Sequence, residues 1–422
     1  MMALVPFAYF TFLTFYWWKK HKGVDICVYM SGLYAISAFC AILIVQLRLL
    51  EHGGVLFDEM DLELNVVPTA LFILLLTLSI LPFSLIHAED IKTIKNHSPF
   101  ILDFFCWMLI ALSLLNFYLV ADSTLDILGG DLEAIRQAHY EGILTPAQIK
   151  AESMPFFFRL FYYLNNATLL ALPLSFYFVC VQKDKPWWFN ALLFFASLSV
   201  PIAGIQAADR TEIMFYILMF IYCVLFFRKT ITRKMKRWAL ILGTPFFLAV
   251  LVYIVAVSQA RFEENEGGAS ASAVEYAGQG YLNFCFFWEK QNTDDIATER
   301  EFPLINHVLF KIDSNSDRRS DRSGKQGFFI SVFPTFVGDI LLDLGFLGVS
   351  IWVIYFFLLG MLLIKSAHRT EFHIGEILAI FVLAAIPIFG VFYYRYFAFT
   401  YSLMIILTFI IYFLSAKRIT LF

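Results

Sequence analysis

The chain has 422 residues, of which 60% are hydrophobic and only 15% are charged, with 49 phenylalanines and 20 tyrosines. Soluble domains are about half apolar and about one quarter charged, so this composition excludes an ordinary soluble protein and indicates a polytopic membrane protein. The net charge of -3 excludes a nucleic-acid-binding protein built on electrostatics, because phosphate neutralisation requires a basic surface.

Apolar runs long enough to cross a bilayer recur along the chain. A hydrocarbon core of about 30 Å requires roughly 17 to 25 apolar residues in a helix. We therefore predict a single all-α integral-membrane domain over residues 1–422, with about eleven transmembrane helices. The predicted ranges are 2–18, 24–47, 66–87, 100–121, 156–181, 187–207, 211–227, 238–257, 346–364, 376–394 and 397–414. The first range is predicted as a span because charged residues, not a cleavage site, follow it.

The connecting segments alternate in charge, and this alternation predicts an orientation. One set is rich in lysine and arginine, as in 19–22, 183–185 and 228–237, whereas the other set is acidic or mixed. Because basic loops stay in the cytoplasm, the amino terminus is predicted outside and the carboxyl terminus inside. Segment 328–345 has three alternatives: a loop, a re-entrant segment or an additional span.

Two outer segments, 122–155 and 258–345, are longer than a connection requires. In the first, Thr145 as N-cap and Pro146 in the first turn predict a short helix. That segment either lies on the membrane surface or covers a substrate. In the second, we predict a lid over 258–327, where polar and small residues flank an aromatic stretch at 281–290.

Cysteine usage predicts neither disulfides nor a metal site. Five of the six cysteines fall in apolar runs, where a thiol behaves as a small hydrophobic group, and only Cys285 is expected in a polar loop. No spacing of cysteine and histidine resembles a zinc site. No cofactor is predicted.

The stretch IQAADRTEIMF, 205–215, places charges directly beside a span. The apolar part that follows, 213–227, is only about fifteen residues and covers roughly 22 Å, less than the hydrocarbon core. Arg210 and Glu212 are therefore expected at the outer rim of the membrane. Either Arg210 extends to the headgroups with Asp209 or Glu212 as its partner, or Arg210 binds an anion. Asp209 and Glu212 are each either a partner of Arg210 or a catalyst.

Asp339 and Asp343, in FPTFVGDILLDLGFLG, are four residues apart and share one helix face. Like charges so close raise each other's proton affinity, which suits a general base. The alternative is a helix start whose acidic residues complement the helix dipole. Gly345 and its neighbouring glycines permit a broken helix.

Several outward cations and aromatic residues complete the candidates. Arginine suits a diphosphate because its planar group makes two hydrogen bonds and stays charged. Arg395 is the most confined, whereas most loop arginines are expected to be solvated. The candidate ligand-binding residues are Arg210, Arg261, Arg395, Arg159, Tyr281 and His307. The remaining loop arginines are Arg300, Arg318, Arg319 and Arg322.

These motifs resemble a family. The ADRTEIM segment, Tyr276, Gly280 and Asn283 in the large outer loop, and PTFVGDILLDLGFLGV before the next span are similar to the bacterial O-antigen or oligosaccharide repeat-unit polymerases. The resemblance covers most of the chain from about 155 to 415. Ala207, Ala208 and Asp209 depart from it, because such proteins often have glycine and serine before the arginine.

The resemblance implies an all-helical membrane glycosyltransferase, similar to enzymes of GT-C type, at the outer face of the inner membrane. It would transfer a growing glycan from undecaprenyl diphosphate onto a lipid-linked repeat unit, without metal or nucleotide sugar. Arg210, Arg261 and Arg395 would stabilise the diphosphate, and Asp343, then Asp339, would activate the acceptor. Implied partners are membrane lipid, a chain-length regulator and a flippase.

Two other functions remain as alternatives. A ligase similar to O-antigen ligases would share the spans, the large outer loop and the outward arginines, but would pass the glycan to another acceptor. A lipid-linked oligosaccharide flippase would be expected to show two similar halves and charges at mid-membrane, and the sequence shows neither.

Overall fold

The computed structural model describes residues 2–47, 64–86, 94–95, 98–128, 146–205, 210–233, 237, 268–291, 295–312, 316–328, 330, 332–370 and 372–416. Over these ranges the chain is helical, and the strand pairing is limited to one isolated bridge between Lys95 and His373. The all-α prediction is therefore confirmed for the described residues. The chain divides into two compact units.

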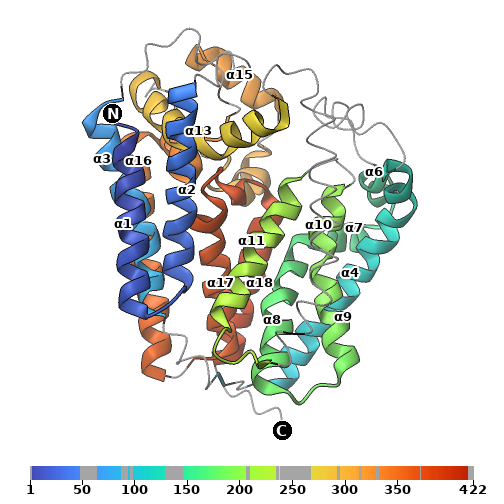
Figure 1. The fold of residues 1–422 in the computed structure, drawn as a ribbon. Coiled ribbons are helices and arrows are strands. Elements are labelled where there is room, and N and C mark those ends of the chain that lie inside the picture. Colours follow the sequence, from blue (N-terminus) through green and yellow to red (C-terminus); the bar gives the residue numbers. More distant parts are fainter. Residues whose placement is uncertain are drawn as a thin grey trace. The chain divides into compact units, whose positions relative to one another are not determined.

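The first unit comprises Met1–Ile86, Phe262–Ser366 and Leu383–Phe399. It contains α1 (Leu4–His21), α2 (Ile26–Leu47), α3 (Val66–Ile80), η2 (Leu81–Leu85), α13 (Gly268–Lys290), α14 (Pro303–Ile305), η6 (Asn306–Phe310), α15 (Ser316–Gln326), most of α16 (Thr335–Thr370), the end of α17 (Ile374–Phe389) and η7 (Arg395–Phe397). Helix α2 packs against both α1 and α13 (Figure 1). A Cβ at Gly278 of α13 would lie 2.5 Å from the backbone of Cys40 and Ala41, so a small residue permits this close helix contact.

The second unit comprises His87–Arg261, Ala367–Val382 and Thr400–Phe422. It contains α4 (Pro99–Leu128), α6 (Pro146–Glu152), α7 (Phe156–Tyr163), η4 (Asn165–Leu170), α8 (Ala171–Tyr177), η5 (Phe178–Gln182), α9 (Trp187–Ser197), α10 (Ser199–Ile205), α11 (Thr211–Phe226), the start of α17 and nearly all of α18 (Phe399–Ala416). Helix α4 packs against α9 and α10, and α10 packs against α11. The predicted helix at Pro146 is present as α6, whereas Thr145 lies outside the described residues.

The long apolar helices agree with a membrane protein. Five described helices are long and apolar enough to cross a bilayer, or six if the bent pair Phe156–Tyr163 and Asn165–Gln182 forms one span. The five are Ile26–Leu47, Val66–Leu85, Pro99–Ala121, Trp187–Ile205 and Thr335–Lys365. Shorter apolar helices occupy Thr211–Phe226, Ile374–Phe389 and Phe399–Ser415. Range 238–257 lies outside the described residues, so the total of eleven spans stays a prediction.

The structure corrects the interpretation of 281–290 as part of a loop. These residues form the second half of α13, and Tyr281, Phe284 and Phe287 are all buried. Cys285 is buried with them, so its predicted place in a polar loop is wrong. Close packing against other helices stabilises this helix. Its polar, glycine-containing first half gave no sign of that packing in the sequence.

Segment 328–345, for which three alternatives were open, is helical from Thr335 onward. Helix α16 is interrupted at Gly345, whose φ of 69° and ψ of −177° are non-helical. A residue with a side chain is strained at this positive φ, which glycine adopts at little cost. The interruption separates a short first segment, which carries Asp339 and Asp343, from the apolar helix that follows.

Candidate functional site

The two aspartates predicted to share a helix face lie buried at the start of α16. Asp339 is 0% exposed and Asp343 is 1% exposed. This start is fixed by two backbone hydrogen bonds, in which Thr335 N–H donates to Phe392 O at 3.0 Å and Phe336 N–H donates to Gly390 O at 2.9 Å. The segment 390–392 therefore determines where the two carboxylates sit.

Asp339 accepts hydrogen bonds from a side chain and from the backbone. Both carboxylate oxygens contact the guanidinium of Arg300, and Tyr394 N–H donates to Oδ2 at 2.8 Å. The Arg300 guanidinium also lies 5.3 Å from the ring centroid of Phe397. Burial lowers the pKa of Arg300, but the negative charges of Asp339 and Asp343 outweigh burial, so that its pKa lies above the ordinary value. The guanidinium of Arg300 is thus kept charged in a buried position.

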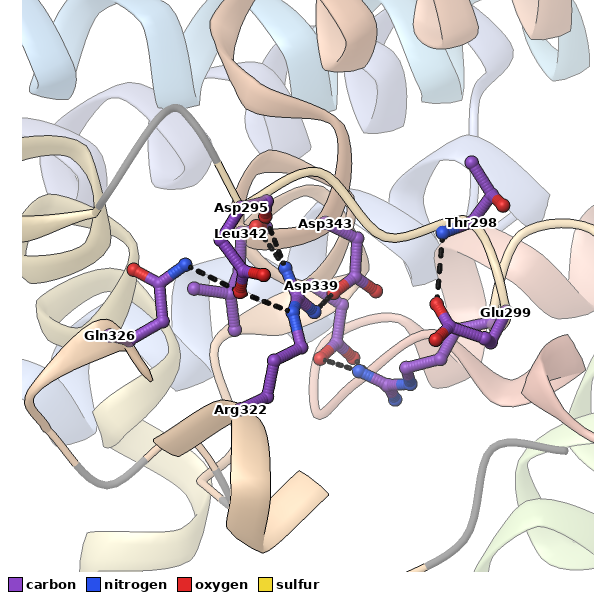
Figure 2. A network of polar contacts seen from close by, with 9 residues as sticks. Asp295, Thr298, Glu299, Arg322, Gln326, Asp339, Leu342 and Asp343 are labelled. Carbon is purple, nitrogen blue, oxygen red and sulfur yellow. Dashed lines mark hydrogen bonds and ion pairs between the residues drawn. The ribbon is translucent and has the colours of Figure 1, made fainter. Parts of the chain in front are cut away.

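Asp343 pairs with Arg322, which α15 contributes (Figure 2). The same guanidinium contacts the Asp295 carboxylate through Nε at 3.0 Å and donates to the Asp295 carbonyl at 3.1 Å. Gln326 donates to the Asp295 carboxylate at 3.2 Å. Arg322 therefore ties α15 and the loop at Asp295 to the first segment of α16.

The interruption at Gly345 explains two further contacts of this network. A break in a helix leaves the carbonyls of the preceding turn without their usual donors. Here Leu342 O accepts from Arg322 Nη2 at 2.9 Å, and Asp343 O accepts from Ala297 N–H at 2.9 Å. The break thus creates acceptors through which the 295–301 loop and α15 attach.

Glu301 adds a third buried carboxyl group beside Asp343. Glu301 is 7% exposed, and within the described part of the chain no donor reaches either of its carboxylate oxygens or Asp343 Oδ2. Burial raises the pKa of Glu301 well above 4.5, and the charge of Asp343 and a hydrogen bond to Asp343 add to this, whereas Arg300 opposes it. If Glu301 carries a proton, it donates a hydrogen bond to Asp343, which explains how two buried carboxyl groups lie side by side.

Replacing Glu301 with glutamine is expected to reduce the loss of stability at rising pH. Above pH 4.5, the ordinary pKa of a glutamate, the unfolded chain releases this proton while the folded protein retains it. The wild-type stability therefore falls as pH rises towards the raised pKa. Glutamine imitates the protonated acid. Between about pH 5 and about pH 8, the thermal midpoint in detergent should therefore fall less for Glu301→Gln than for the wild type.

The matched control is Glu299→Gln, two residues earlier in the chain. Glu299 accepts from Thr298 N–H at 3.0 Å (Figure 2). This variant should keep the pH dependence of the wild type. Equal slopes for wild type and Glu301→Gln would contradict the protonated state of Glu301.

The segment at Arg395 lies against this network. Tyr394 contacts Asp339 and Phe397 contacts Arg300. Arg395 itself is 5% exposed, and its Nη1 donates to Tyr393 Oη at 2.9 Å. His307 stacks on Phe399, with ring centroids 4.6 Å apart and planes at 5°. The structure therefore brings Arg395 and His307 into the same unit as the aspartates.

The candidate residues of α13 serve mainly in packing. Tyr281, a candidate ligand-binding residue, is 1% exposed, and its hydroxyl pairs with Thr69 Oγ1 at 2.7 Å, so its ring packs inside the first unit. Asn283 is also buried and donates to Gln279 Oε1 at 3.0 Å. A Cβ at Gly280 would lie 2.6 Å from Thr335 Cγ2. Gly280 therefore allows α13 to approach the start of α16.

Arg210, Glu212 and Arg159 belong to the second unit. Helix α11 begins at Thr211, directly after Arg210, and its 16 residues are as short as the sequence indicated. Glu212 lies in the first turn and accepts from Tyr401 Oη at 3.2 Å. Arg159 is half-buried on α7. Asp209 and Arg261 lie outside the described residues.

Sequence reasoning missed the partners of the two aspartates. Arg300 and Arg322 were expected to be solvated, but the guanidinium of Arg300 is buried and that of Arg322 is largely shielded, each against a carboxylate. Glu301 was not singled out at all. Its one sequence signal is the charged run TERE, 298–301, directly before the apolar stretch that starts at Phe302. The side chains of Arg318 and Arg319 are not described.

The site therefore offers carboxylates and guanidinium groups. Among the described residues, no group of three or more His, Cys, Asp and Glu side chains is placed to hold a metal ion. What the network can do is position charge and move a proton between Glu301 and Asp343. Comparisons of the chain with models of protein families, with curated proteins and with solved structures found no match.

Proposed function

We propose that the protein is a membrane glycosyltransferase that lengthens a glycan carried on a polyprenyl diphosphate, at the outer face of the bacterial inner membrane. One observation carries the proposal: Asp343 and Glu301 present carboxyl oxygens for which the described residues offer no donor other than the proton of Glu301 itself, beside the buried Arg300 and the largely shielded Arg322, in a chain of apolar helices. The hydroxyl groups of a sugar are the donors that such oxygens bind.

The chemistry of the transfer suits these groups. The hydroxyl oxygen of the acceptor sugar forms a bond with the anomeric carbon of the donor, and the bond from that carbon to the diphosphate breaks. The hydroxyl proton passes to the Asp343 carboxylate, which acts as general base. The diphosphate leaves with the electron pair and needs cations more than an acid. For the diphosphate we propose Arg395, which belongs to the same unit as Asp343, and we keep Arg210 and Arg261 as the further candidates that the sequence indicates.

Replacing Arg210 with alanine is expected to abolish glycan elongation while the protein remains in the membrane. The guanidinium at the start of α11 would otherwise hold the diphosphate by charge-assisted hydrogen bonds. Single repeat units should accumulate in place of the polymer, as measured by gel electrophoresis of extracted glycans. Arg233→Ala, at an exposed position after the other end of α11, is the control. Normal elongation in Arg210→Ala would return Arg210 to a role at the lipid headgroups.

The proposed function is tested by deleting the gene and examining the surface glycan. Loss of the glycan ladder with persistence of single repeat units supports the proposal, and restoration by the wild-type chain completes the test. An intact ladder would refute it. Long glycan that stays on the lipid carrier identifies a ligase instead, because a ligase acts after elongation. Repeat units that remain on the cytoplasmic face identify a transporter.

A further inference from the structure

A short apolar segment directly follows Arg300 and Glu301 and exposes most of its large side chains. Its exposed residues are Phe302, Ile305, Val308, Leu309 and Phe310, with exposed fractions from 45% to 68%. The helical part, α14 and η6, spans Pro303 to Phe310. Eight residues cover roughly 12 Å, so this segment cannot cross a bilayer.

The segment is held in place with this apolar side facing outward. Pro303 and Asn306 are buried on its other side. Asn306 Nδ2 donates to Thr298 O at 2.9 Å and to Phe302 O at 3.1 Å, and Ile312 N–H donates to Asn306 O at 3.1 Å. His307 stacks on Phe399. The outward apolar side is therefore a fixed surface of the first unit.

Contacts with α16 indicate the depth of this surface. Ala297 N–H donates to Asp343 O, and Glu301 lies beside the same aspartate. Beyond Asp343, the exposed apolar residues of α16 begin at Phe346 and Leu347. Phe346 follows Asp343 by only three residues, directly after the interruption at Gly345. The segment therefore attaches to α16 where its first part, which is buried and carries the two aspartates, meets the part whose apolar side chains are exposed.

We propose that residues 302–310 lie in the lipid–water interface of the leaflet on the Asp343 side, with Phe302, Ile305, Val308, Leu309 and Phe310 among the acyl chains of phospholipids. Interfacial helices place their apolar face among the acyl chains in this way, and here the opposite side is held by the protein. Exposed Lys311 ends the segment, where its ammonium group is available to anionic headgroups.

This location deepens the proposed function. Arg300 and Glu301 immediately precede the segment, so a segment anchored at this depth holds them at the level of the headgroups. A lipid-linked substrate carries its diphosphate at that same level. The location itself depends only on the membrane nature of the chain, and it is testable without any glycan substrate.

The test uses the full chain in vesicles of phosphatidylcholine and phosphatidylglycerol. An environment-sensitive dye is attached to Leu309→Cys, and quenching is measured with lipids that carry a nitroxide close to the headgroup or near the acyl-chain end. Lys325→Cys, exposed on polar α15, and Ile354→Cys, exposed well inside the apolar part of α16, are the matched controls. Labelled wild type corrects for the native cysteines.

We expect the dye at Leu309 to be quenched most by the shallow nitroxide, with blue-shifted emission. The dye at Ile354 should be quenched most by the deep nitroxide, and the dye at Lys325 by neither. If Leu309 behaves as Lys325 does, the inference is wrong, whether water, another part of the chain or a second copy covers the segment. Because quenching does not depend on catalysis, this failure is distinguishable from failure of the proposed function.

Discussion

Replacing Asp343 with asparagine is expected to slow glycan elongation by about 10²- to 10⁴-fold, the usual contribution of a general base. Asparagine has nearly the same shape and still offers an oxygen to Arg322, but it cannot take the proton of an acceptor hydroxyl. Asp343 is 1% exposed, and apart from the proton of Glu301 its Oδ2 has no donor among the described residues. Elongation would be measured in membrane vesicles supplied with lipid-linked repeat units, normalised to the amount of protein.

The control for this prediction is Asp295→Asn. Asp295 contacts the same guanidinium, through Nε of Arg322 at 3.0 Å, but it has no contact with Glu301 in the described network. If the Asp343 carboxylate acts as base, Asp295→Asn should retain most of the elongation rate. Equal losses in the two variants would show that positioning of Arg322 matters and that Asp343 is not the base.

The positions of the two aspartates could be predicted from the sequence because their spacing is a local property. Residues four apart lie on one helix face, and Asp339 and Asp343 do so at the start of α16. The break at Gly345 also has a local cause, since glycine accepts a positive φ. The first site residues therefore followed from a stretch of sixteen residues.

The partners could not be predicted because they come from distant parts of the chain. Arg300 is 39 residues from Asp339, and Arg322 is 21 residues from Asp343. No periodicity joins such positions, and a serine- and aspartate-rich setting is typical of solvated loops. Only the folded chain shows that the break in α16 leaves carbonyls that attract Arg322.

Helix α13 was missed for a different reason. Its first half is rich in glycine, alanine and serine, which resembles a linker by composition, and its apolar half is too short for a span. The same small residues permit the close approach of Gly278 to the backbone of α2. Composition alone does not separate a flexible linker from a helix that packs closely against protein.

The second large effect is expected when the Arg300–Asp339 pair is broken, and it is a loss of stability of the folded protein. Asp339→Ala removes the carboxylate that faces a guanidinium in a position that is 8% exposed. Removing one partner of a buried ion pair leaves an uncompensated charge and typically costs about 3–5 kcal/mol. The alanine also removes the acceptor of Tyr394 N–H. We therefore expect a much lower thermal midpoint in detergent, with loss of the monodisperse peak in size-exclusion chromatography.

A double variant separates this structural effect from a role in the reaction. Asp339→Leu combined with Arg300→Met replaces both charges with apolar groups, a change that is often neutral for a buried pair. The double variant should recover most of the stability that either single change loses. If it is stable and still elongates glycan, the pair serves to hold the 295–301 loop against α16. If it is stable and inactive, the charges of Asp339 and Arg300 act on the substrate. A wild-type midpoint in Asp339→Ala alone would contradict the ion pair as a support of the fold.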